Sequence, residues 1–214
     1  AALVGNDGSI DWLCLPYFDS PAVFNSLLDD EKGGRFLISA IYAVDHRQIY
    51  FPETNILITR FSSADSAAQV TDFMPVHDEH EFGGDSWVDE VADLCCDDSK
   101  VIRLVQGLLG ETSMRMECRP AFEFASTAHQ VEKTDGGVIF TSANGERLSL
   151  TAACDFTIAN GAAFAEFKLD HGESIAFVLE HIDRNGVTPT SLTTNEADSQ
   201  FKETVEFWRD WVSK

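Results

Sequence analysis

Strict alternation of apolar and polar residues in short runs is the feature that most constrains this chain. The clearest run spans residues 112–119. One face of a strand there would carry Thr112, Met114, Met116 and Cys118, and the other Ser113, Arg115, Glu117 and Arg119. A single strand register buries the first set and solvates the second, whereas a helix would scatter both sets around its axis. Similar runs, broken by turn residues, recur from Phe36 to Leu179 and predict an all-β fold, an antiparallel super-sandwich of two packed sheets.

Three pairs of these runs are separated by turn-forming residues, and we expect each pair to form a hairpin. Residues 101–105 are joined to the run at 112 through a loop that contains Gly107 and Gly110. The runs 138–141 and 148–150 flank Asn144-Gly145, the dipeptide best suited to positive φ in a tight turn. Residues 163–169 and 174–179 are joined by a short turn, Asp170-His171-Gly172-Glu173.

The periodicity becomes helical after Pro189. Four apolar residues recur at helical spacing on one stripe: Phe201, Val205, Trp208 and Val212. Phe207 and Trp211 lie beside that stripe, and Asn195 with Asp198 is the expected N-terminal cap. We predict a helix over 194–214 that is too apolar to lack a packing partner.

Charge and cysteine usage exclude several classes of function. A formal net charge of −21 argues against binding to nucleic acid or anionic membranes, whereas neutral sugars are not repelled. No window approaches the roughly 20 consecutive apolar residues that cross a bilayer. Five cysteines at irregular spacing do not form a disulfide framework, so we expect reduced thiols in a cytoplasmic protein, with Cys14 and Cys118 buried. Because the chain begins at Ala1 in a turn-rich stretch, we expect its N-terminus to be trimmed, and a targeting signal is neither seen nor excluded.

The segment 77–100 interrupts the strand pattern with many acidic residues around Gly83-Gly84 and predicts a surface loop. Its side chains His77, His80, Cys95 and Cys96 have the atom types of a zinc site. However, vicinal cysteines rarely ligate one ion, and the spacing matches no standard finger, so we predict no metal. Phosphate-binding, dinucleotide-binding and serine-nucleophile glycine motifs are absent, and we expect no cofactor.

Five motifs occur in a fixed order along the chain: GNDGSIDWLCLPYFDSP (5–21), FPETNIL (51–57), TDFMPV (71–76), MRMECRP (114–120) and FWRDWVS (207–213). Together they resemble the N-terminal β-sandwich domain of bacterial-type family 15 glycoside hydrolases, which include glucoamylases, glucodextranases and trehalase-like enzymes. The resemblance implies a sandwich domain over 1–193 and a linker helix over 194–214 that leads into an (α/α) barrel. It also implies inverting hydrolysis of α-glucosidic bonds in an α-glucan or trehalose, with both catalytic glutamates in the barrel and none in this chain. The barrel would then be the partner of this domain, contacted through Phe201, Val205, Trp208 and Trp211.

The first motif has several interpretations. In the structural one, Asp7-Gly8 forms a tight turn, Trp12, Leu13 and Leu15 enter the core, and Asp19-Ser20-Pro21 turns the chain. In a second one, implied by the resemblance, Asp11, Trp12, Tyr17 and Asp19 face the barrel near its sugar cleft, although Tyr17 stands where the family would have arginine.

Two functions of other classes stay open. A stand-alone carbohydrate-binding module would hold glucan on the aromatic residues of the first motif. A hydrolase within this chain would need two carboxylates about 6.5–9.5 Å apart, for which Asp7, Asp11 and Asp19 are the local candidates. We expect Asp72, flanked by apolar residues, to accept hydrogen bonds from the backbone or an arginine at a strand end.

Overall fold

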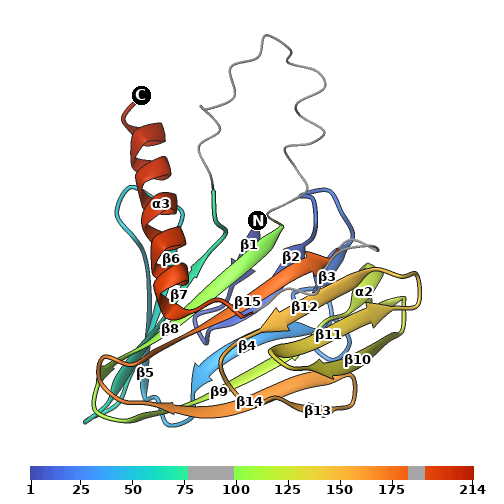
Figure 1. Cartoon of the computed structure of the whole chain (residues 1–214), viewed down its shortest axis with the longest axis horizontal. Helices are drawn as coiled ribbons and strands as arrows, with labels where there is room; N and C mark the ends of the chain where they lie inside the picture. The colour runs from blue at the N-terminus through green and yellow to red at the C-terminus, as the bar shows by residue number, and fades with distance from the viewer. Residues whose placement is uncertain (77–98, 183–190) are drawn as a thin grey trace.

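The structure, a computed structural model, describes residues 1–76, 99–182 and 191–214. These residues form two antiparallel sheets packed face to face, with one long helix near the C-terminus (Figure 1). The predicted all-β sandwich with a C-terminal helix is therefore confirmed.

The first sheet comprises β1 (Ala2–Val4), β2 (Ser9–Cys14), β3 (Ala22–Phe24), β4 (Arg35–Ala40), β9 (Thr112–Arg119), β13 (Thr157–Ala159) and β14 (Ala162–Leu169). Its order is β1-β2-β4-β9-β14-β13, and β3 pairs with β2. The second sheet comprises β5 (Asp45–Tyr50), β6 (Leu57–Ser62), β7 (Ala67–Phe73), β8 (Lys100–Leu109), β10 (His129–Thr134), β11 (Gly137–Ser142), β12 (Arg147–Thr151) and β15 (Ser174–Ile182). Its order is β10-β11-β12-β15-β8-β7-β6-β5. The described residues also form α2 (Phe122–Ala125) and α3 (Thr194–Val212).

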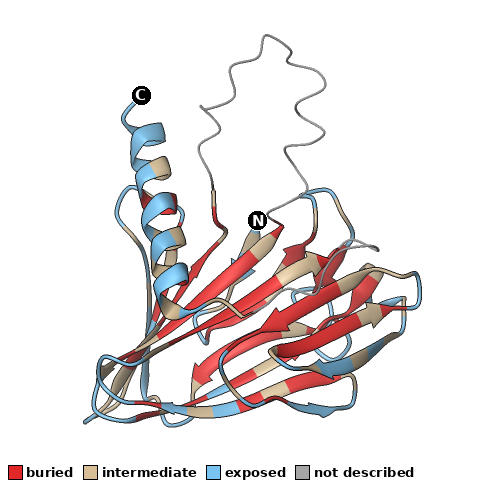
Figure 2. Cartoon of the chain, in the orientation of Figure 1, coloured by how far each residue is buried: buried red, intermediate tan, exposed pale blue. Residues whose placement is uncertain are grey.

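The central strands of the second sheet are buried on both faces, because the first sheet covers one face and α3 covers the other. On β8, Val101 and Val105 point into the core between the sheets, whereas Ile102 and Leu104 belong to a second cluster with Ala197 and Val205 of α3. Figure 2 shows this burial as continuous red along the middle strands. On β9 the predicted alternation is confirmed, since Thr112, Met114, Met116 and Cys118 are buried and the residues between them are less so.

Two of the three predicted hairpins are wrong. Strands β8 and β9 lie in different sheets, as do β14 and β15, so each connection carries the chain across the sandwich. Gly110 has φ of 55° in the first connection, and Gly172 has φ of 86° in the second. The two crossovers support each other, because the Gly107 and Gly172 N–H groups donate to Glu173 O and Gly107 O, both at 2.9 Å. The third prediction is confirmed: β11 and β12 pair around Gly145, whose φ is 87°.

The predicted cap of α3 at Asn195 is also wrong. The N-cap is Thr193, whose side chain accepts from Glu196 N–H while the Glu196 carboxylate accepts from Thr193 N–H at 2.7 Å. This reciprocal capping box satisfies two backbone donors and places Asn195 inside the first turn.

The predicted acidic loop, 77–100, lies almost wholly outside the described residues, and its last residue, Lys100, already belongs to β8. In the three described stretches, no helix has the length and apolar character needed to cross a membrane.

Candidate functional site

A β-bulge in β2 changes the direction of the first motif's side chains. Strand β1 pairs Leu3 with Trp12 and Val4 with Ile10, so Asp11 is an extra residue on β2. As a result Ile10 and Leu13 both enter the core, whereas Asp11 and Trp12 are both only half-buried. Bulges commonly re-aim side chains next to functional sites. The core position predicted for Leu13 is confirmed, and Trp12 lies nearer the surface than the structural interpretation expected.

Hydrogen bonds from two serine hydroxyl groups hold the Asp11 carboxylate. Ser9 Oγ donates to Asp11 Oδ1 at 2.6 Å, and Ser26 Oγ donates to the same oxygen at 2.9 Å. Ser26 follows β3, so these bonds tie the bulge to the next turn of the chain. The carboxylate therefore acts first as a local brace.

The Trp12 ring contacts a strained turn. Its centroid lies 6.1 Å from that of Phe124, and the rings are tilted by 45°. Three successive residues in α2, Glu123, Phe124 and Ala125, have φ of 50°, 58° and 64°. Left-handed backbone costs L-residues roughly 1–2 kcal/mol each and clusters at functional positions. This turn holds the Phe124 side chain 52% exposed against Trp12.

Glu123, in the same turn, carries a fixed negative charge. Thr127 Oγ1 donates to one carboxylate oxygen at 2.6 Å, and Asn144 Nδ2 donates to the other at 2.8 Å. The Thr127 bond, followed by the Asn144 bond, lowers the pKa of Glu123 below its ordinary value. The group is therefore an acceptor of hydrogen bonds and a poor proton donor.

Tyr17 and Asp19 lie in the exposed loop that follows β2. Within that loop, Tyr17 N–H donates to Ser20 Oγ at 3.0 Å, and Ser20 N–H donates to Tyr17 O at 3.2 Å. Of the four residues predicted for this surface, the described contacts thus join Trp12 to Phe124 and Asp11 to Ser26. Sequence reasoning missed the Phe124 turn, which contains no glycine or asparagine to signal left-handed backbone.

A second surface lies between the far half of α3 and the β5–β6 turn. There a groove of about 370 Å³ is lined by Tyr50, Phe51, Pro52, Glu53, Thr54, Asn55, Trp208, Trp211 and Val212. The Trp208 and Trp211 rings meet edge to face at 5.9 Å, and Trp211 is 62% exposed. Trp208 Nε1 is buried and has no hydrogen-bond partner among the described residues. Arg209 lies over the Phe51 ring at 5.6 Å and anchors this end of the helix.

Two of the four predicted helix contacts are already covered by the sandwich. Phe201 meets the rings of Phe51 at 5.4 Å and Phe73 at 5.8 Å, and Val205 is buried in the cluster beneath the helix. Trp208 and Trp211 are the two predicted contacts with free surface. Their contact with a barrel stays a prediction, as does the division of the chain at residue 193.

The prediction for Asp72 is confirmed by an arginine that sequence reasoning missed. Arg103, fully buried on β8, donates from Nε to Asp72 Oδ1 at 2.8 Å. It also donates across the sandwich to Gly8 O at 2.6 Å and to Phe36 O. An isolated charge in the apolar run 101–105, with an isolated acid in the run 70–74, was the available signal.

The described cysteines, Cys14, Cys118 and Cys154, are free thiols, and the predicted burial of the first two is confirmed. Burial raises the pKa of the Cys118 thiol well above its ordinary value and that of Cys154 to about 11. These thiols are therefore poor nucleophiles. His77, His80, Cys95 and Cys96 lie outside the described residues, and within the described ranges no three potential metal-ligating side chains cluster.

Comparison with known proteins gives a consistent result. The family model described as "Trehalase-like, N-terminal" matches residues 1–205. A trehalase of Thermoplasma acidophilum is 30% identical, and the alignment covers 99% of this chain and 34% of that trehalase. A trehalase of Thermoplasma volcanium is 29% identical, and the alignment covers 100% of this chain and 32% of that trehalase. The chain thus spans about a third of the length of the curated relatives it matches. A solved structure, "Putative kojibiose phosphorylase from human microbiome", aligns with 96% of the chain and 33% of its own, but at a TM-score of 0.41 and 9% identity it supports no argument.

Proposed function

Because this chain belongs to the trehalase-like N-terminal family, we propose that it is the non-catalytic sandwich domain of a larger α-glucosidic hydrolase. In this proposal the domain braces an (α/α) barrel of the family 15 type, which follows α3 and carries both catalytic glutamates. The barrel hydrolyses trehalose or a related α-glucosidic bond with inversion, one glutamic acid protonating the leaving oxygen while a glutamate activates water. The names and lengths of the trehalase relatives support this proposal.

The observation that carries the bracing role is the uncovered far half of α3. Trp211 and Val212 are exposed, and the buried Trp208 N–H lacks a partner among the described residues. Tryptophans dominate the energy of protein interfaces, and their N–H groups usually find a partner when buried. A barrel surface with an acceptor opposite Trp208 satisfies both requirements.

The bulged face of β2 supports a second contact with the same barrel. Asp11, Trp12, Tyr17 and Asp19 would line one side of its sugar cleft, with the Trp12 and Phe124 rings offered to the apolar faces of a sugar. The locked bulge and the strained turn fit this role, because both hold side chains in fixed directions at a surface. We also propose a cytoplasmic location, which the free thiols of the described cysteines support.

The first experiment is to sequence the transcript beyond the codon for Lys214. A frame that continues into a helical-repeat region with two candidate glutamates supports the proposal, and a stop codon contradicts it. In the longer protein, glucose release from trehalose is then measured for Trp211→Ala and for the control Leu28→Ala, another exposed apolar residue. We expect only W211A to weaken docking of the two domains, seen as earlier unfolding of the barrel and lower glucose release.

A stand-alone carbohydrate-binding module is the second candidate. The exposed Phe124 ring against Trp12 favours it. It predicts that the 214-residue chain binds maltooligosaccharides and that Trp12→Ala removes binding. A third candidate, hydrolysis by this chain itself, predicts glucose release that is lost on mutation of Asp11 and Asp19. The two serine bonds to Asp11 Oδ1 weigh against it, because they give this carboxylate a structural role between β2 and the Ser26 turn.

A further inference from the structure

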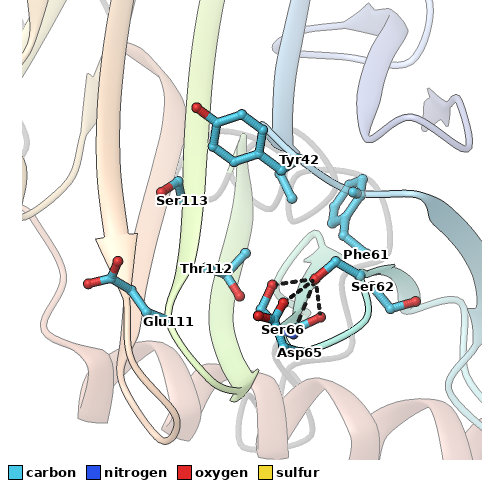
Figure 3. Close-up of a pocket in the computed structure, with 11 residues that line it drawn as sticks. Tyr42, Phe61, Ser62, Asp65, Ser66, Glu111, Thr112 and Ser113 are labelled. Atoms are coloured by element: carbon cyan, nitrogen blue, oxygen red, sulfur yellow. Dashed lines mark hydrogen bonds between the residues drawn. The ribbon is translucent and has the colours of Figure 1, made fainter.

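A separate pocket of about 280 Å³ lies where the chain crosses between the two sheets. Three connections form it: residues 40–43 after β4, residues 61–66 around the β6–β7 turn, and residues 111–113 at the start of β9 (Figure 3). Its volume is just below the roughly 300 Å³ at which pockets for drug-sized ligands begin, so it suits a ligand of single sugar-ring size.

The lining of this pocket is rich in hydroxyl groups. They belong to Tyr42, Ser62, Ser63, Ser66, Thr112 and Ser113. Within the turn, Ser63 Oγ is 2.8 Å from Ser66 Oγ and donates to Asp65 Oδ1 at 3.2 Å, so these groups are held in place. Hydroxyl groups both donate and accept, which suits a ligand that does the same.

Thr112 has an unused hydroxyl in this wall. The residue is only 5% exposed, and its Oγ1 finds no hydrogen-bond partner among the residues that the structure describes. Figure 3 shows the side chain directed toward the Asp65–Ser66 turn. Burying a hydroxyl without a partner is unfavourable, and such groups in native proteins call for a ligand, water or ion.

The charges at the pocket decide which class of ligand fits. Two carboxylates line it, Asp65 and Glu111, and Lys168 pairs with Glu111 at 2.6 Å. An anion is disfavoured by these groups and by the net charge of −21. A metal ion is disfavoured because Glu111 is already paired with Lys168, and no group of three potential metal ligands occurs among the described residues. Carboxylates and hydroxyls together suit the hydroxyl rim of a neutral sugar.

Aromatic rings complete the pocket. Phe61 is fully buried, and Tyr42 is 78% exposed. An exposed ring beside hydroxyl acceptors can cover the apolar C–H face of a pyranose while the rim forms hydrogen bonds. We propose that this pocket binds one neutral monosaccharide through Thr112, the Ser63–Ser66 turn and the Tyr42 ring. This binding step is additional to bracing a barrel, and only the choice of D-glucose as the probe rests on the proposed function.

The test is a titration of the 214-residue chain with D-glucose, followed by backbone amide NMR shifts. Thr112→Val removes the hydroxyl and keeps the shape. Thr151→Val is its matched control, because Thr151 Oγ1 is also buried without a partner among the described residues but lies outside this pocket. We expect T112V to raise the Kd about 2- to 10-fold, the loss of roughly one hydrogen bond, and T151V to bind like the natural chain. Without sugar, neither variant should unfold earlier.

A second pair of variants tests whether the Tyr42 ring contributes to binding without destabilising the fold. Tyr42→Ala removes an exposed ring without opening the core and should weaken binding, whereas Tyr42→Phe, which keeps the ring, should bind nearly as well as the natural chain. Absence of saturable glucose binding, or equal Kd values for T112V, Y42A and the natural chain, overturns the proposal. Trehalose hydrolysis by the longer protein is measured independently. If the pocket does not bind glucose, the proposed function is unaffected, and if the longer protein does not hydrolyse trehalose, the result for the pocket is unaffected.

Discussion

The two ends of α3 share one apolar stripe but have different surroundings. In the first half, Ala197, Phe201 and Val205 pack on β7, β8 and β15. In the second half, Trp211 and Val212 are exposed beside a groove, and the Trp208 N–H has no partner within the described part of the chain. The helical stripe continues through both halves, so periodicity alone does not reveal where the sheet beneath it ends. The packed half serves the fold, and the open half is the part available to a partner.

The interior of the sandwich contains a buried charge whose hydrogen bonds join the two sheets. Arg103 is fully buried, yet its guanidinium donates to Asp72, Gly8 and Phe36, so strands of both sheets are joined through one side chain. Buried charges are tolerated only with such partners. Trp208 and Thr112 differ from Arg103 in two ways: each has a polar group without a partner among the described residues, and each lines a groove or pocket.

The largest effect should follow from removing that interior group. Arg103→Met leaves the Asp72 carboxylate buried without its partner, and we expect a loss of about 3–5 kcal/mol in the free energy of unfolding. Urea unfolding measures it. The control is Arg47→Met, whose ion pair with Asp45 is exposed and should contribute less than about 1 kcal/mol. Equal losses for the two variants would break the distinction between interior and surface.

A smaller effect is expected for the packed half of α3. Phe201→Ala removes a ring that meets Phe51 and Phe73. Because Phe201 is only partly buried, we expect a loss of about 2 kcal/mol, below the 3–5 kcal/mol typical of a fully buried phenylalanine. Urea unfolding measures this loss in the free energy of unfolding. If F201A were neutral, the helix would not be anchored where the structure places it.

The cap of α3 should contribute less again. Thr193→Ala removes the acceptor for Glu196 N–H, and we expect a loss of about 1 kcal/mol. The Thr193 side-chain and backbone hydrogen bonds lower the pKa of Glu196. Since its folded pKa lies below the unfolded one, the contribution is complete above the unfolded pKa and is lost as pH falls through the folded pKa. Stability measured between pH 7 and 3 should therefore fall less for Glu196→Gln than for the natural chain, and parallel curves would contradict the capping box.

The faces of the strands could be predicted from the sequence, but their partners could not. The alternation in 112–119 predicts which residues are buried, and the structure confirms their burial. It does not distinguish a hairpin from a crossover between sheets, because both bury the same residues. The difference depends on the φ of Gly110 and on the approach of the Asp170 carbonyl to Gly107, where a Cβ would lie 2.2 Å from that oxygen.

The candidate surfaces were predictable to a similar degree. Asp11, Trp12, Trp208 and Trp211 are identified by residue type and by resemblance. The bulge that points Asp11 and Trp12 the same way is a property of the β1–β2 register, and no residue type signals it. The partner of Trp12, Phe124, follows from a left-handed turn without glycine. Both features depend on contacts between distant parts of the chain, which local patterns do not encode.

The smallest effect on stability should come from the open half of α3. Trp211→Ala removes a large ring that is mostly in solvent, and we expect the free energy of unfolding of the 214-residue chain to change by less than about 0.5 kcal/mol. The expected loss for F201A is about 2 kcal/mol, so these two variants test directly whether the packed and open parts of α3 differ. A loss for W211A as large as that for F201A would show that Trp211 already packs on its own domain. The groove would then be part of the fold, and the strongest reason for a partner at this surface would disappear.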